Sequence, residues 1–207
     1  MELSQKIFNY YKKLIFDNRR WLYVIIVIFA VGVTLGLFTA QTKTEITKKI
    51  IAQYAESIDK SLRAGWEVTQ VIFTRNVFVV VVATLTSLIL GFSSVFVVFI
   101  NGTILGLFIG FGEMYSKITP WQLFLLLFPH GIFEYAGIFL GLSFSLRLGL
   151  NWLRKASKGK RLIVLKTNIK ETAAILILTI IILGFAAIIE GFLTVNIACL
   201  FGGLCIK

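Results

Sequence analysis

The chain has 207 residues, of which 57% are hydrophobic and only 15% are charged, and its formal net charge is +11. A soluble domain of this size needs more polar surface, and the long apolar runs do not alternate as barrel strands do. The sequence therefore predicts an all-α, polytopic helical membrane protein with about five transmembrane helices. Because the basic residues flank apolar runs, we expect contact with membrane lipids and no binding of nucleic acid.

The first 20 residues carry five basic side chains and an apolar stripe with helical spacing. The stripe comprises Ile7, Tyr10, Tyr11, Leu14 and Ile15. This pattern predicts a basic amphipathic helix over residues 1–20, lying on the cytoplasmic surface of the membrane. Residues 21–207 then form a single helical transmembrane domain, whose first span covers 21–40. That span lacks a small-residue cleavage site, so we expect it to be retained.

Residues 42–66 are polar and amphipathic, which predicts a helix along the membrane interface. Thr42 and Glu45 could form a capping box at its start, and Gly65 would end it. The apolar stretch that follows is nearly twice as long as one crossing requires. Its break is expected at the sequence Gly91-Phe92-Ser93-Ser94, which gives two antiparallel spans over 75–92 and 94–112.

The next apolar run contains Pro129, His130 and Gly131. Proline lacks a backbone donor and disfavours helix at the residue before it, while glycine loosens the following position. We therefore predict a helix break at Pro129 and Gly131. Residues 121–128 are too short to cross and would form a re-entrant half-helix, whereas 129–150 is long enough for a span.

The last clear span covers 171–191, after a segment over 147–170 with eight basic residues and no acid. Five crossings place this segment on the same side as residues 1–20. The positive-inside rule then predicts a cell membrane protein with a cytoplasmic N-terminus. The sequence leaves open whether 192–206 crosses the membrane. Cys199 and Cys205 are expected to be packing residues, with a disulfide as the less favoured alternative.

Small residues repeat every four positions on three of the predicted spans. They are Gly32 and Gly36, then Gly102, Gly106 and Gly110, then Gly137, Gly141, Ser145 and Gly149. Lipid tails are as apolar as leucine, so membrane helices gain from the close backbone approach that small residues permit. We expect tight helix packing at these positions, either within one chain or between the subunits of a homodimer.

Polar side chains also lie within the apolar runs or at their edges. They are Asn76, Asn101, His130, Glu134 and Glu190. A carboxylate at the bilayer centre costs about 2–3 kcal/mol even on the lenient insertion scale. These side chains must therefore face protein or water and need partners. His130 and Glu134 are four residues apart and share one face of a helix.

Two interpretations of these polar residues remain open. His130, Glu134 and Glu190 could form a metal site or a proton relay, or the cluster could pin the broken helix against its neighbours. A zinc protease needs a second histidine one turn away, and the chain has a single histidine. We therefore predict no catalytic residue, no metal and no cofactor, and interpret the cluster as structural or ligand-binding.

Four short motifs follow one another between about residue 70 and residue 195. They are Arg75-Asn76, then Asn101-Gly102 with Gly106, then Pro129-His130-Gly131-Ile132-Phe133-Glu134, and finally Ile189-Glu190-Gly191-Phe192-Leu193-Thr194. In this order they resemble the stage II sporulation protein M family. The resemblance makes the five polar residues, with Gly102, Pro129 and Gly131, signature positions. Val195 departs from the pattern, because proline usually follows the threonine.

The resemblance implies a multi-pass membrane protein. In spore formers the namesake acts with two partner proteins in membrane migration during engulfment, and the partners degrade peptidoglycan. We do not transfer that process to this chain.

Three functions follow from these observations. The first is a non-enzymatic membrane scaffold, expected to be a homodimer, that recruits other membrane or membrane-associated proteins. The alternative is a transporter or channel for an ion, lipid or small solute, because a broken helix beside a carboxylate is typical of substrate sites. The third, an intramembrane hydrolase using His130 and Glu134, lacks a complete catalytic motif.

Overall fold

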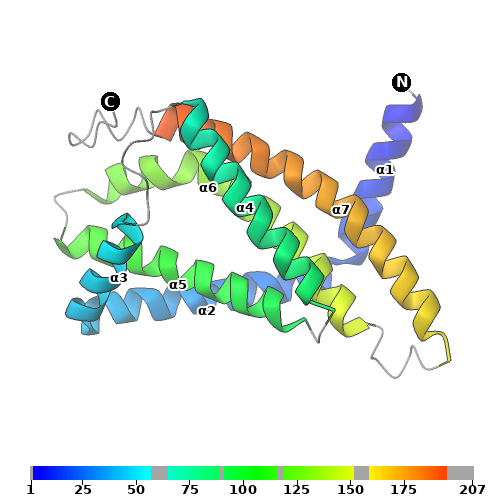
Figure 1. Cartoon of the computed structure of the whole chain (residues 1–207), viewed down its shortest axis with the longest axis horizontal. Coiled ribbons are helices and arrows are strands. Elements are labelled where there is room, and N and C mark those ends of the chain that lie inside the picture. The colour runs from blue at the N-terminus through cyan, green and yellow to red at the C-terminus, as the bar shows by residue number, and fades with distance from the viewer. Residues whose placement is uncertain (1, 57–64, 89–90, 116–118, 152–158, 195–207) are drawn as a thin grey trace.

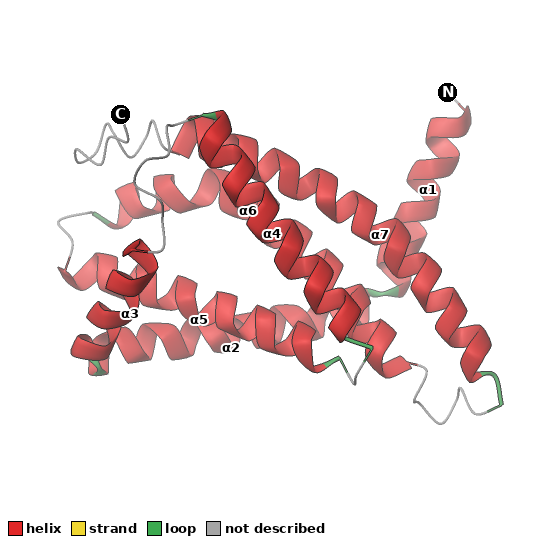
Figure 2. Ribbon diagram, viewed as in Figure 1, coloured by secondary structure: helices red, strands yellow, loops and turns green. Residues whose placement is uncertain are grey.

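The computed structural model describes residues 2–56, 65–88, 91–115, 119–151 and 159–194. These ranges are almost entirely helical (Figures 1 and 2). The elements are α1 (Glu2–Asp17), α2 (Arg19–Thr42), α3 (Thr44–Glu56), α4 (Trp66–Thr86), α5 (Phe92–Tyr115), α6 (Pro120–Asn151), α7 (Arg161–Ile189) and the π-helical turn η2 (Glu190–Thr194). Five of the described helices are long and apolar enough to cross a membrane, which confirms the predicted class.

Helices α2 and α5 lie side by side and run in the same direction (Figure 1). Their glycines face one another in register. A Cβ atom on Gly32 would lie 2.5 Å from the carbonyl oxygen of Phe99, and one on Gly36 would lie 3.0 Å from the Cα of Gly106. One turn further on, Gly110 faces the fully buried Ala40. These contacts depend on the absence of side chains, as expected for small-residue packing in membranes.

The small residues of α6 face α4 and α7. A Cβ on Gly137 would lie 3.2 Å from the side chain of Leu183 on α7, and one on Gly141 would lie 2.9 Å from the side chain of Val80 on α4. Gly149 lies against the backbone at Ser87, beyond the end of α4. All of the small residues predicted to pack thus make close contacts within one chain. The homodimer expected from the sequence gains no support from them.

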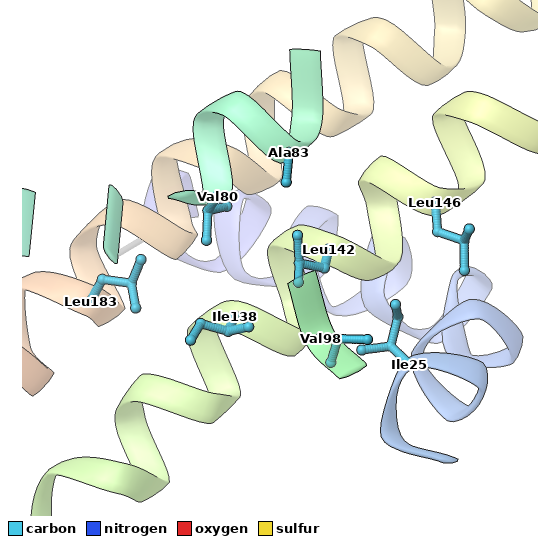
Figure 3. Close-up of a cluster of buried hydrophobic side chains, with 8 residues drawn as sticks. All are labelled: Ile25, Val80, Ala83, Val98, Ile138, Leu142, Leu146 and Leu183. Carbon is cyan, nitrogen blue, oxygen red and sulfur yellow. The ribbon is translucent and has the colours of Figure 1, made fainter. Parts of the chain in front are cut away.

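The main core lies where all five spanning helices meet (Figure 3). Its buried members are Ile25, Val80, Ala83, Val98, Ile138, Leu142, Leu146 and Leu183. A second, smaller cluster includes Leu14 of α1, together with residues of α6 and α7. Two further hydrogen bonds, one from α1 and one from Asn18 directly after it, attach this part of the chain to the bundle. The Tyr11 hydroxyl donates to the Ala174 carbonyl across 3.3 Å, and the Asn18 amide donates to the Ser143 hydroxyl across 2.9 Å.

The predicted helix break at Pro129 and Gly131 is wrong. Helix α6 continues without interruption from Pro120 to Asn151, so residues 121–128 are its first turns and not a separate re-entrant half-helix. A break would leave several backbone groups without partners in lipid, whereas an internal proline removes one donor. Continuing the helix is therefore the less costly solution, even at about 3 kcal/mol for the proline.

Several predicted boundaries also shift. The second span begins at Trp66 rather than 75 and ends at Thr86 rather than 92. The helix can continue through Asn76 because its polar side chain finds a partner within the bundle. The turn does lie where the glycine predicted it, since Gly91 has φ +68° and α5 begins at the next residue. Helices α6 and α7 likewise begin earlier than the spans predicted over 129–150 and 171–191.

The predicted amphipathic helix over 42–66 also differs from the structure. Thr42 belongs to α2 and donates its hydroxyl to the Phe38 carbonyl across 2.8 Å, so it forms no capping box with Glu45. Residues 44–56 form α3. Gly65, with φ +94°, is the residue before α4, which begins at Trp66, the last residue of the predicted range. Residues 57–64 lie outside the described part of the chain, as do Cys199, Cys205 and the segment after Thr194.

Candidate binding cavity

A cavity of about 600 Å³ lies between α4, α5, α6 and η2. Its lining is largely apolar, with side chains such as Val79, Ile104 and Phe108. Its polar lining residues are Arg75, Asn76, Asn101, His130, Glu134, Tyr135, Glu190 and Thr194. All five polar residues singled out from the sequence therefore line one cavity, although they come from four different elements.

Asn76 and Glu134 connect α4 to α6 across the cavity. The side-chain amide of Asn76 donates a hydrogen bond of 3.0 Å to Oε1 of Glu134. Arg75 precedes Asn76 on α4, and its guanidinium interacts electrostatically with the carboxylates of both Glu134 and Glu190. A buried carboxylate needs such partners, because its transfer out of water is costly. Arg75 was not included in the polar cluster predicted from the sequence.

His130 and Thr194 connect α6 to η2. His130 is buried, and its Nδ1 lies 2.9 Å from the Thr194 hydroxyl oxygen. The tautomer that donates from Nδ1 to this hydroxyl leaves a lone pair on Nε2. The hydroxyl therefore holds the ring in one orientation at the wall of the cavity. The sequence analysis did not identify Thr194 as a partner for the only histidine.

Glu190 completes a compact group with His130 and Glu134. One nitrogen or oxygen atom from each of these three side chains lies within 4.8 Å of the others. The acids and the imidazole thus point toward a common place and do not face lipid separately. Two carboxylates at this separation repel one another strongly in a medium of low dielectric constant. The group is suited chemically to share a proton or to bind a cation.

The position of Glu190 depends on the π-helical turn at the end of α7. Gly191, the second residue of η2, packs directly on the start of α4. Its carbonyl accepts a 2.9 Å hydrogen bond from the Gly65 amide. A Cβ atom here would lie 2.8 Å from the Gly65 carbonyl oxygen and would overlap the Thr69 hydroxyl. Short π-helical segments occur often at functional sites, where they reposition a side chain.

Asn101 of α5 also lines the cavity, but its hydrogen bond is made within its own helix. Its side-chain amide donates to the Val97 carbonyl of its own helix across 2.8 Å. A local bond of this kind satisfies a donor without help from another element. The structure therefore gathers His130, Glu134 and Glu190, attaches Asn76 to them, and leaves Asn101 apart.

A second polar contact lies on α6 beyond the cavity. The buried guanidinium of Arg147 forms an ion pair with Glu171 of α7 and stacks over the Phe144 ring, 4.9 Å from its centroid. The sequence analysis counted Arg147 in the basic segment over 147–170 and assigned it no partner. Neither the pair nor its burial could be read from spacing, because the two residues belong to different helices.

Comparison with known protein families identifies a match. A family model described as Stage II sporulation protein M matches residues 25–195. The matched region contains every residue that lines the cavity. No significant match was found among curated proteins or among solved structures.

Proposed function

Because the chain belongs to the stage II sporulation protein M family, we propose that it is a non-enzymatic membrane protein that holds partner proteins at one end of its helical bundle. This end, called the basic end here, comprises α1, the start of α2, the end of α6 and the start of α7. The observation that carries the proposal is the way α1 projects from the bundle while remaining fixed to it (Figure 1).

Helix α1 presents a surface suited to contact with another protein. Its exposed side chains include apolar ones, such as Leu3 and Phe8, and basic ones, such as Lys12 and Lys13. Leu14 and the hydrogen bonds of Tyr11 and Asn18 hold the helix in place. A surface that is already ordered loses little conformational entropy when a partner binds.

The charge of the basic end indicates an acidic partner surface. A hollow of about 330 Å³ at this end is lined by Arg19, Arg20 and Arg147, together with Asp17 and Asn151. Guanidinium groups bind carboxylates through paired hydrogen bonds, and complementary charge also speeds association. The same end carries the segments that the positive-inside rule assigns to the cytoplasm. A cytoplasmic N-terminus in the cell membrane is therefore part of the proposal, whereas a homodimer is not.

The test is recovery of cross-linked partners from native membranes in mild detergent. Lys12→Glu/Lys13→Glu reverses two exposed charges on α1, and we expect it to lose the partners that the parent chain recovers. Lys43→Glu/Lys49→Glu makes the same change beside and within α3, at the other end of the bundle, and should retain them. Equal recovery by both variants and the parent chain would refute a partner site on α1.

We keep one other candidate function because of the cavity, the translocation of a cation or small solute. Polar side chains within the spans of a membrane protein commonly mark such paths. The direct measurement is solute flux into proteoliposomes. Flux that is present in the parent chain and lost in Glu134→Gln would favour transport over partner binding, while equal flux in loaded and empty vesicles would rule transport out.

A further inference from the structure

We propose that His130, Glu134 and Glu190 bind one divalent transition-metal ion, such as Zn²⁺, in the wall of the cavity. The sequence alone favoured a polar cluster without a metal, chiefly because no second histidine exists. Three features of the structure support a metal site instead: the convergence of the three ligand atoms, the hydrogen bonds behind two of them, and the charge of the cavity.

The three ligand atoms are close enough to share one ion. They lie within 4.8 Å of one another. Zinc binds nitrogen and oxygen at about 2.0–2.2 Å, so its ligands in a tetrahedral site are about 3.5 Å apart. Small side-chain rotations of Glu134 and Glu190 would close that difference. Since His130 and Glu134 are one turn apart on α6, only the approach of η2 is needed to complete the set.

Two of the ligands are held from behind by hydrogen bonds. Thr194 contacts Nδ1 of His130, so Nε2 is the ring nitrogen that we assign to the ion, and Asn76 donates to one oxygen of Glu134. Metal ligands in proteins usually have outer partners of this kind, which fix the orientation of the ligand before the ion arrives. In the tautomer that donates from Nδ1 to Thr194, Nε2 carries the lone pair that a metal ion requires.

The charge of the cavity favours a cation. Among its lining residues, Arg75 brings one positive charge and the two carboxylates bring two negative charges when ionised. The remaining negative charge is poorly screened among apolar walls. One imidazole and two carboxylates suit Zn²⁺, Mn²⁺ or Fe²⁺ better than Mg²⁺ or Ca²⁺, which prefer sites made of oxygen alone. Three protein ligands also leave a coordination position open toward the cavity.

Zinc binding to the purified full-length chain in detergent tests this site. The protein should be prepared without a polyhistidine tag, because His130 is the only histidine, and the thiols of Cys199 and Cys205 should be blocked. We expect saturable binding of one Zn²⁺ per chain by calorimetry, and a rise in the unfolding temperature that Mg²⁺ does not produce. Folded protein that shows neither effect would overturn the proposal.

Variants separate this site from adventitious binding. His130→Ala and the nearly isosteric Glu190→Gln should abolish saturable binding. Asn76→Ala should weaken it by about 10–100-fold, as the loss of an outer partner does. Asn101→Ala changes the same cavity without touching a ligand and should bind zinc as the parent chain does. Unchanged binding in His130→Ala and Glu190→Gln would show that zinc lies elsewhere.

The proposals of a metal site and of a partner surface can be refuted independently of one another. Lys12→Glu/Lys13→Glu should leave zinc binding unchanged, because α1 does not line the cavity. Loss of zinc in Glu190→Gln with normal recovery of partners would support the metal site alone.

Discussion

The backbone amide of Gly65 donates a 2.9 Å hydrogen bond to the carbonyl of Gly191, although the two glycines are far apart in the sequence. This contact ties the π-helical turn η2 to the first turn of α4. Because Glu190 and Thr194 both belong to η2, the same contact positions the acid beside Glu134 and the hydroxyl beside His130.

Replacing Gly191 should therefore destabilise the protein. In Gly191→Ala the new methyl group would meet the Gly65 carbonyl oxygen and the Thr69 hydroxyl. We expect a loss of about 1–3 kcal/mol in the free energy of unfolding, which is typical of overpacking. Gly184→Ala on α7 is the matched control, since its methyl group would meet only the Phe73 ring at 3.6 Å. Unfolding followed by circular dichroism in detergent compares the two; equal stability would contradict the packing at Gly191.

The glycine register between α2 and α5 leads to a second prediction. Gly36→Val would push apart two helices whose backbones touch at Gly106. The unfolding temperature should fall, while the mass of the folded particle in detergent should not change, because this contact lies within one chain. Light scattering coupled to size-exclusion chromatography measures the mass. A fall in mass by half, without loss of stability, would instead place the glycines at a subunit interface.

The ion pair between Arg147 and Glu171 can be examined with a double-mutant cycle. Glu171→Leu leaves the buried guanidinium of Arg147 without its partner and should cost about 3 kcal/mol or more. Arg147→Leu/Glu171→Leu removes both charges and should be less destabilised than Glu171→Leu. The measurement is the free energy of unfolding of the two single variants and the double variant. Strict additivity would mean that the two side chains do not interact.

The continuous α6 predicts that Pro129→Ala stabilises the protein. Alanine restores a donor for the Leu125 carbonyl and removes a cost of about 3 kcal/mol, so the unfolding temperature should rise. If the helix were broken at this residue, as the sequence suggested, the same substitution would disturb the break and lower the unfolding temperature. Unchanged zinc binding in this variant would show that His130 keeps its position without the proline.

The sequence predicted those properties that depend on one segment alone, such as its length, its hydropathy and the polar or small residues within it. The length and hydropathy of the apolar runs determine that five helices can cross a bilayer, because unpaired backbone groups are not tolerated in lipid. Placing a polar side chain in lipid costs free energy, so five residues were expected to face protein or water: Asn76, Asn101, His130, Glu134 and Glu190. All five line the cavity. The glycine repeats likewise predicted close helix packing.

Only the tertiary structure decided which of these residues meet. Asn76 was expected near the start of a span over 75–92. Its side-chain amide instead donates a hydrogen bond to Glu134 of another helix, and α4 begins ten residues earlier, at Trp66. The pairing of His130 with Thr194, and the approach of Glu190, depend on how α7 is rotated and ends against α4. Spacing along one helix fixes which side chains share a face, but the register between helices is set by packing. For that reason the sequence identified the residues of the cavity and left their partners undetermined.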